Sequence, residues 1–266
     1  MRVHVVSDVH GNTDALARAG DGADALIVLG DLIDFVDYHD HSAGILGRIF
    51  GPEQVRRFAE LRSGHGGDLV GFVRSLWAQL DDPAAVVEGE VREQYRQLFG
   101  SLTAPTYAMP GNVDMPHLWP EFAGNGVTLC DGRAVEIGGR VFGFVGGGVL
   151  PAGVTAEVVA RRRLGPWRPY LRTTVEFDAA VAALPPVDVL ASHIPPAVAE
   201  LCYDVVARHP ERGSPRLLEY INDGRPSLAL FGHVHAPLCR RMRVGRTECV
   251  NVGHFQRTET PHVLRW

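Results

Sequence analysis

The sequence predicts an α/β protein built on mixed β-sheets. Apolar runs bounded by Gly or Asp, which are typical of buried strands, alternate along the chain with segments of helical periodicity. Strands that alternate with helices imply α/β architecture. Over Val127–Val145, and again over Arg240–Trp266, short strands are joined by turns, which indicates antiparallel pairing. Parallel and antiparallel sections in one chain favour mixed sheets over a single parallel sheet.

The individual strands and helices follow from these patterns. No internal repeat, and no linker rich in Pro, Gly or Ser, divides the chain, so we expect one domain over residues 1–266. We expect helices over Thr13–Ala19, Thr174–Leu184 and Ser214–Ile221. The expected strands are Val3–Val6, Ala25–Leu29, Thr106–Met109, Val141–Val145, Val187–Ala191 and Ser227–Phe231.

The segment from residue 35 to residue 104 differs from the rest because it carries three helical patterns and little strand signal. Apolar residues between Leu69 and Leu80 fall on one helical face. That face either packs on the main body, or forms a cap over a site or a dimer contact. We expect this insertion to contribute specificity or assembly but no metal ligand, so that His39, His41 and His65 are solvated loop histidines.

Five short polar segments carry the chemistry, and each begins where an expected strand ends. In open α/β sheets, binding sites form at the carboxyl ends of strands, where several loops converge. Five loops from five strands are therefore expected to meet at one place. The segments are Asp8-Val9-His10-Gly11-Asn12, Gly30-Asp31-Leu32-Ile33-Asp34, Gly111-Asn112-Val113-Asp114, Ser192-His193 and Gly232-His233-Val234-His235.

The residue types in these segments fit a metal cluster. Carboxylates together with imidazoles suit Mn, Fe, Zn or Ni better than a metal that prefers thiolates. Asp8 and His10 are two residues apart, as are His233 and His235, so in an extended segment each pair points to one side. A single Gly-Asp or His at a strand end is usually a turn or core residue, whereas five such segments in this order are hard to assign to chance.

The order D-x-H, G-D-x-x-D, G-N-x-D, H, G-H-x-H, from Asp8 to His235, resembles the signature of the calcineurin-like metallophosphoesterase superfamily. The resemblance implies a four-layer α/β/β/α sandwich with two central mixed sheets. It also implies two divalent metal ions, with Mn as the expected metal and Fe, Zn or Ni as alternatives. The first ion would take Asp8, His10, Asp31 and His235, and the second would take Asp31, Asn112, His193 and His233.

One position departs from the family pattern. Many members read G-N-H-D or G-N-H-E, and that His is thought to protonate the leaving group or stabilise charge in the transition state. Here the position is Val113, as in variants such as the YfcE-like phosphodiesterases, which also lack the His. Asp114, which in the usual pattern orients the His, would then cap the following turn. The departure argues against efficient hydrolysis of unactivated monoesters.

The resemblance implies hydrolysis of phosphate esters by a hydroxide that two metal ions hold, with phosphodiesters or activated monoesters as substrates. Asp31 and Asn112 are the expected catalytic residues, and Asn12, Asn112 and His254 are the expected substrate contacts. His254 could equally be a surface turn residue. Two alternatives remain: a scaffold that uses the metal-site surface to bind a protein partner, and a monoester phosphatase for small molecules or phosphoproteins.

Composition and net charge limit the classes of partner that we expect for this protein. A net charge of −5 provides no overall basic field for nucleic acid, although Arg161–Arg163, Arg168 and Arg172 form a local basic run that is either solvated or a patch for an anionic substrate. No segment approaches the roughly 20 apolar residues of a membrane helix. The four cysteines form no C-x-x-C pair, and no signal peptide pattern is present. We therefore expect a cytoplasmic hydrolase with a small phosphate-ester substrate, and homo-oligomerisation stays open.

Overall fold

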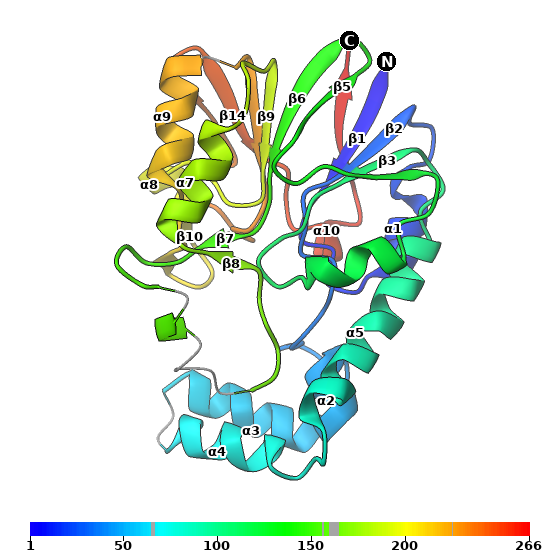
Figure 1. Cartoon of the computed structure of the whole chain (residues 1–266), viewed down its shortest axis with the longest axis vertical. Coiled ribbons are helices and arrows are strands. Elements are labelled where there is room, and N and C mark those ends of the chain that lie inside the picture. The colour runs from blue at the N-terminus through cyan, green and yellow to red at the C-terminus, as the bar shows by residue number, and fades with distance from the viewer. Residues whose placement is uncertain (65–66, 156, 160–164, 225) are drawn as a thin grey trace.

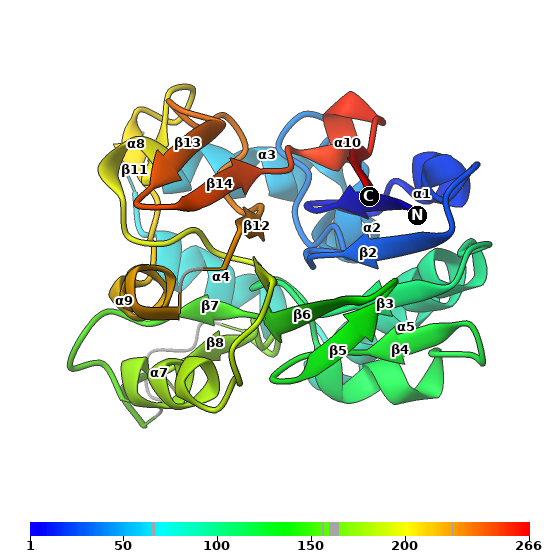
Figure 2. The ribbon, with the colours of Figure 1, turned by 90° about the horizontal axis from the view of Figure 1, so that it is seen from above.

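Two mixed β-sheets form the centre of the molecule, as Figures 1 and 2 show. The computed structural model describes residues 1–64, 67–155, 157–159, 165–224 and 226–266. The first sheet has five strands, and β1, β2, β3 and β4 run parallel whereas β15 pairs antiparallel with β1. Its strands, in spatial order, are β15 (His262–Arg265), β1 (Arg2–Val6), β2 (Ala25–Val28), β3 (Thr106–Ala108) and β4 (Val127–Leu129).

The second sheet has six strands. The inner strands β14, β12, β9 and β6 are parallel, and both edge strands, β13 and β5, pair antiparallel with their neighbours. The sheets are thus mixed, as the sequence predicts. In spatial order the strands are β13 (Arg241–Val244), β14 (Thr247–Asn251), β12 (Leu228–Phe231), β9 (Val189–Ser192), β6 (Arg140–Val145) and β5 (Ala134–Ile137).

Helices cover the outer face of each sheet, which gives the four layers seen from above in Figure 2. On one side, α7 and α9 pack on the six-stranded sheet, and on the other α1 and α5 pack on the five-stranded sheet. A third apolar core lies between the two sheets, with Val5 and Ile27 of one facing Phe144 and Leu230 of the other. The predicted four-layer sandwich is therefore confirmed. The covering helices are α1 (Thr13–Ala19), α5 (Pro83–Gly100), α7 (Thr174–Ala182) and α9 (Pro215–Gly224).

Most of the insertion projects beyond the edge of the sheets, at the bottom of Figure 1. Its described residues form four helices, where the sequence patterns predict three. Asp68 caps α4, and its carboxylate accepts a hydrogen bond from Gly71 N–H, while Asp82 caps α5 in the same way. Through α5 the insertion returns to the main body. Its other helices are α2 (Gly44–Phe50), α3 (Pro52–Arg62) and α4 (Leu69–Trp77).

The remaining elements are short. Two small strand pairs lie outside the main sheets: β7 runs parallel to β8, and β10 runs antiparallel to β11. Among the helices of the described residues, none has both the length and the apolar character that a membrane span requires. The short elements are η1 (Pro116–Glu121), β7 (Gly148–Val149), β8 (Leu171–Arg172), α8 (Ala199–Cys202), β10 (Tyr203–Asp204), β11 (His209–Pro210) and α10 (Phe255–Thr258).

The antiparallel section expected over Val127–Val145 is correct only in part. β5 and β6 do form an antiparallel pair, but β4 belongs to the other sheet and runs parallel to β3, with Tyr107 opposite Thr128. The pattern of a short strand after a glycine identifies the strand but not its partner. Cys130, the residue after β4, is fully buried between the two sheets, where the chain crosses from one sheet to the other.

Candidate metal centre

The carboxyl ends of strands from both sheets meet at one edge of the sandwich, and the predicted ligand loops begin there. Asp8 follows β1, Asp31 follows β2 and Asn112 follows β3 in the five-stranded sheet. His193 follows β9 and His233 follows β12 in the six-stranded sheet. The structure thus brings all five predicted loops to one place, as the strand-end argument requires.

Several of these residues hold a backbone conformation that non-glycine residues rarely adopt. Six non-glycine residues of the described chain have positive φ, and four of them are predicted ligands: Asp8 at 58°, His10 at 41°, Asp31 at 53° and His233 at 66°. Left-handed backbone of this kind persists only where the surroundings enforce it, and it clusters at functional sites. The loops therefore hold these side chains in place at a conformational cost.

The first group of ligand-type atoms belongs to Asp8, His10 and Asp31, and these atoms lie within 4.8 Å of one another. Nε2 of His10 lies 4.0 Å from a carboxylate oxygen of each aspartate. His235 joins them, because its Nε2 lies 3.3 Å from Oδ1 of Asp8 and 3.3 Å from Nε2 of His10. The four residues predicted for the first metal are therefore neighbours.

The second group belongs to Asp31, His193 and His233, again with ligand atoms within 4.8 Å of one another. Oδ2 of Asp31 lies 3.4 Å from Nε2 of His193, and the ring centroids of His193 and His233 are 5.3 Å apart. Asn112 joins this group, since its Oδ1 lies 3.0 Å from Nε2 of His193. Asp31 is the residue that the two groups share.

Backbone carbonyls fix the orientation of two of the imidazoles. Nδ1 of His193 donates to Leu29 O at 2.8 Å, and Nδ1 of His10 donates to Ile33 O at 3.3 Å. A carbonyl only accepts, so the hydrogen sits on Nδ1, and Nε2 of a neutral ring keeps its lone pair for a metal. Both bonds turn Nε2 toward the cluster.

Asp114 is fully buried and connects the loop after β3 with the loop after β2. Its Oδ1 accepts hydrogen bonds from Leu32 N at 3.1 Å and from the Tyr95 hydroxyl at 3.2 Å, and its Oδ2 accepts one from Gly111 N at 2.8 Å. Burial and the nearby charge of Asp31 raise the pKa of Asp114 to about 6. The prediction that Asp114 caps only the following turn is therefore too narrow, because it organises both loops.

The charges of the cluster depend on one another. Burial disfavours the ionised form of Asp31, but the adjacent His193 outweighs burial and lowers the pKa of this carboxyl. Burial lowers the pKa of His193, yet the Asp31 carboxylate outweighs it and raises that pKa to about 9. Burial and the charge of His193 lower the pKa of His233 to about 4. Without a metal, the cluster thus relies on its own imidazolium to balance its carboxylates.

The residues present fit divalent transition metals. Asp8 and Asp31 are buried, and no arginine of the described chain pairs with either carboxylate. Nε2 of His193 lies 3.0 Å from Oδ1 of Asn112 and 3.4 Å from Oδ2 of Asp31, so oxygen acceptors converge on the place where its proton stands. A cation satisfies such acceptors, and carboxylate, imidazole and amide oxygen are suitable ligands.

The predicted substrate contacts fall in two different environments. His254 stacks on His235 with ring centroids 3.8 Å apart, and its ligand atoms group with those of His10 and His235. Asn12, in contrast, caps α1: its Oδ1 accepts from Ala15 N at 3.1 Å, and its Nδ2 donates to Gln256 O at 3.0 Å. These bonds give Asn12 a structural task, so we propose no substrate contact for it.

A cleft of about 440 Å³ opens beside the cluster. His10, Asn112, His235 and His254 line one part of it, and Val113 lies among them. The other part belongs to residues of the insertion and of the loop before β8. The position that holds a His in many relatives thus presents an apolar side chain to this cleft.

The remaining basic and histidine candidates differ in their surroundings. His39 lines the cleft, but none of the three groups of ligand-type residues found in the described chain includes it. Arg172 is committed to Asp131, with 2.5 Å between Nη2 and Oδ2, and to the Tyr170 hydroxyl. Arg168 lies at the wall of a neighbouring cavity. His65 and Arg161–Arg163 lie outside the described residues.

Sequence reasoning missed the residues that support the cluster from other segments. Gln94 of α5 binds the backbone of Asp34 twice, since its Oε1 accepts from Asp34 N at 2.9 Å and its Nε2 donates to Asp34 O at 3.1 Å. Gln256 donates to His10 O at 3.0 Å, and its Oε1 lies 3.2 Å from Nε2 of His254. A polar residue on the buried face of α5 is the only sequence signal for Gln94, and Gln256 has none.

Comparison with known proteins identifies the family and agrees with the fold. A family model for calcineurin-like phosphoesterases matches residues 1–237. The chain is similar to the crystal structure of TT1561 of Thermus thermophilus, with 15% identity, a TM-score of 0.56, and coverage of 99% of this chain and 98% of that chain. A second crystal structure is similar at 14% identity and a TM-score of 0.57, over 96% of this chain and 91% of that one. No curated protein matches the sequence. At these identities the two structures support the fold alone.

Proposed function

The chain belongs to the calcineurin-like phosphoesterase family, and from this premise we propose that it hydrolyses phosphodiesters or activated phosphate monoesters with two divalent metal ions. The observation that supports this most is the position of Asp31, which is shared by two groups of ligand-type residues. Asp8, His10, Asp31 and His235 would hold one ion, and Asp31, Asn112, His193 and His233 the other. Mn is the proposed metal, with Fe, Zn or Ni as alternatives of the same ligand preference.

Bound divalent cations supply positive charge for the phosphoryl oxygens and lower the pKa of water, which is the chemistry that phosphate hydrolysis needs. Backbone groups of the chain orient the side chains that would hold these cations. The carbonyls of Leu29 and Ile33 orient the imidazoles of His193 and His10. The backbone N–H of Val113 donates to Oδ1 of Asp31 at 2.9 Å, which leaves Oδ2 free to face the cluster.

The chain offers few groups that could protonate the leaving group of a phosphate ester. Val113 occupies the place of the usual His and carries no proton. His254 also lines the cleft, but burial and its neighbour His235 lower the pKa of His254 to about 4. A neutral imidazole of that basicity is a poor proton donor near neutral pH. We therefore favour substrates with good leaving groups.

The test is hydrolysis of bis(p-nitrophenyl) phosphate by protein freed of metal and then loaded with Mn²⁺. We expect turnover only in the loaded protein, and we expect Asp31→Asn to lower kcat/KM by more than about 100-fold, because changes around metal ligands alone cost about 10–100-fold. The matched control is Asp223→Asn, which changes an exposed residue of α9. Metal binding without turnover of any ester would favour the scaffold alternative instead.

A further inference from the structure

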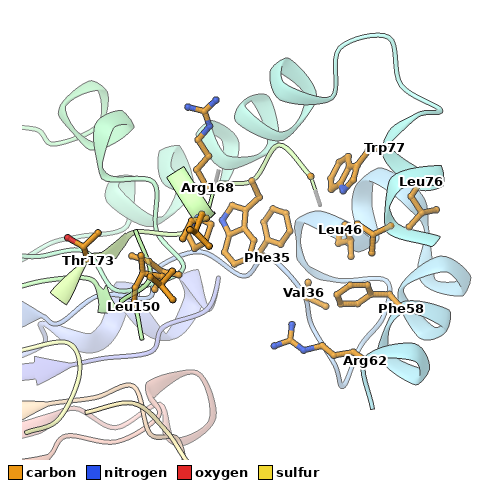
Figure 3. Close-up of a pocket in the computed structure, with 18 of the residues that line it drawn as sticks. Phe35, Val36, Leu46, Phe58, Arg62, Leu76, Trp77, Leu150, Arg168 and Thr173 are labelled. Carbon is orange, nitrogen blue, oxygen red and sulfur yellow. The ribbon is translucent and has the colours of Figure 1, made fainter. Parts of the chain in front are cut away.

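A second cavity, of about 450 Å³, lies between the insertion and the segment that precedes and follows β8 (Figure 3). Helix α2 contributes Leu46, α3 contributes Phe58, and α4 contributes Val73, Leu76 and Trp77. The volume is within the range of small-molecule sites, about 300–1,000 Å³. The insertion is therefore not packed flat on the main body but walls a chamber of ligand size.

The part of the chamber wall that the structure describes is apolar. The polar side chains in its described wall are Arg62, Arg168, Thr173 and Glu176, and every other described lining residue is aliphatic, aromatic, Gly or Pro. Figure 3 shows Arg62 at one margin and Arg168 extending away from the aromatic centre. Small-molecule sites are lined predominantly by hydrophobic and aromatic side chains, with few polar groups. The wall thus fits a hydrocarbon group and offers few partners to a polar one.

This chamber adjoins the cleft beside the candidate metal centre, and the two spaces share part of their walls. Phe35, Val36, Arg62, Trp167, Pro169 and Leu171 line both. Phe35 and Trp167 stack with their ring centroids 4.2 Å apart, and Trp167 Nε1–H donates to Val113 O at 3.2 Å. The aromatic pair therefore connects the insertion to the loop that carries Asn112. A ligand that occupies both spaces would therefore pass beside this pair.

We propose that the substrate is a phosphoester that carries a long aliphatic chain, with the phosphate at the metal centre and the chain in this apolar chamber. The inference deepens the proposed function and rests on it. The polar cluster and the hydrocarbon wall, joined by one set of lining residues, match the two halves of an amphiphile. Arg62, which borders both spaces, places a positive charge where the anionic head joins the chain.

The decisive experiment varies only the length of the aliphatic chain in the substrate. Methyl, butyl, octyl and dodecyl p-nitrophenyl phosphodiesters share one leaving group, and Mn²⁺-loaded protein is assayed with each below its micelle concentration. We expect kcat/KM to rise with chain length by up to about fourfold per buried methylene, which corresponds to about 0.8 kcal/mol. Decyl and geranyl esters, which have equal carbon numbers, then separate a linear chain from a branched isoprenoid, and a preference for either supports the proposal.

Two variants fill the chamber from opposite walls, so that one remains informative if the other fails to fold. Val73→Phe acts from α4, and Val154→Trp acts from the half-buried loop before β8. Each is expected to collapse the ratio of octyl to methyl kcat/KM toward one. The control Val175→Trp adds the same bulk at a residue that is 78% exposed and lines neither cavity, and it should keep the parental ratio.

The outcomes separate this inference from the function it rests on. Two results would overturn the proposal of an aliphatic substrate but leave the proposed phosphoesterase activity standing. The first is metal-dependent turnover that does not change with the length of the alkyl chain. The second is a dependence on alkyl-chain length that both Val73→Phe and Val154→Trp retain. If no ester is turned over, the proposed function fails, and binding of methyl- and octylphosphonate, measured by isothermal titration calorimetry, decides the inference alone. Equal affinity for the two phosphonates overturns it, whereas tighter octylphosphonate binding that Val154→Trp abolishes supports it.

Discussion

The carboxylate of Asp114 accepts a hydrogen bond from the backbone N–H of Leu32, at 3.1 Å, across 82 residues of sequence. This bond joins the loop that carries Asn112 to the loop that carries Asp31, so the two loops hold one geometry. Tyr95 adds to it, because its hydroxyl donates to Asp114 and accepts from Met115 N at 2.7 Å. Asp114 therefore holds together two loops of the candidate metal centre although it is not itself one of the proposed ligands.

The first prediction concerns Asp114→Asn. The amide keeps the size of the side chain but presents N–H groups to backbone N–H donors, so at least one buried donor loses its partner at a cost of about 1–3 kcal/mol. We expect a lower free energy of unfolding in urea and a metal affinity about 10–100-fold below that of the parent. Asp223→Asn is the exposed control. An Asp114→Asn protein with parental Mn²⁺ affinity would mean that the loops hold their geometry without this carboxylate.

The second prediction concerns metal removal. A ligand that binds only the folded state stabilises it by mass action, by about 2.7 kcal/mol at a concentration 100 times its Kd. Removal of metal with a chelator should therefore lower the Tm, and Mn²⁺ should restore it. Elemental analysis should give two ions per chain. In Asp31→Asn, which leaves a neutral amide between the two groups, the rise in Tm and the second ion should both disappear. A Tm rise of parental size in this variant would contradict the shared role of Asp31.

The third prediction concerns pH. Burial, reinforced by the charge of Asp37, raises the pKa of Asp34 to about 7, against 3.8 as its ordinary value, while Arg48 lowers it. Between these two values the unfolded chain has lost this proton and the folded chain retains it. The free energy of unfolding contributed by Asp34 therefore falls as pH rises from about 4 to about 7, by about 1.4 kcal/mol per pKa unit at most.

Asp34→Asn removes this titration without changing size, and the Asp34 carboxylate accepts no hydrogen bond within the described chain. We expect the variant to gain stability relative to the parent as pH rises through this window, with little difference at pH 4. Urea unfolding of metal-free protein at several pH values measures it. A difference that stays constant across the window would show that Asp34 ionises normally in the folded chain.

The parts of the site that could be predicted from sequence are those with a local signal. Each loop that carries a proposed ligand, such as Asp8 or His193, begins at the end of an apolar strand, so the strand-end rule places the loop. The bond between Leu32 and Asp114 and the double contact of Gln94 with Asp34 could not be predicted, because they join segments 60 or more residues apart and leave no periodicity. For the same reason, β4 could be recognised as a strand but not assigned to its sheet.

The insertion illustrates the same limit. The apolar face from Leu69 to Leu80 predicts an amphipathic helix, and Val73, Leu76 and Trp77 of α4 are buried. The pattern of one helix does not distinguish a face that packs against a core from a face that lines a chamber. That distinction depends on Trp167, about 90 residues away in sequence, which stacks on Phe35. Both descriptions apply here, since Val73 and Trp77 pack in the core cluster and also line the chamber.

The last prediction concerns the leaving group and Val113. Without a proton donor, the departing oxygen leaves as an anion, which matters little for nitrophenolate and greatly for an alkoxide. Acid–base assistance is typically worth about 10²–10⁴-fold, so the parent should show a steep dependence of rate on leaving-group pKa. Val113→His should raise the rate for poor leaving groups, toward the lower end of that range, and change the rate for nitrophenyl esters little.

A series of aryl and alkyl phosphodiesters of increasing leaving-group pKa, assayed with parent and variant, measures this prediction. Val113→Met is the matched control, because it adds bulk to the same wall of the cleft without a titratable group. The steep dependence should persist in Val113→Met and flatten only in Val113→His. A flat dependence in the parent would mean that another residue beside the cluster already supplies the proton. His254, stacked on His235 within the same cleft, would then be the first residue to replace.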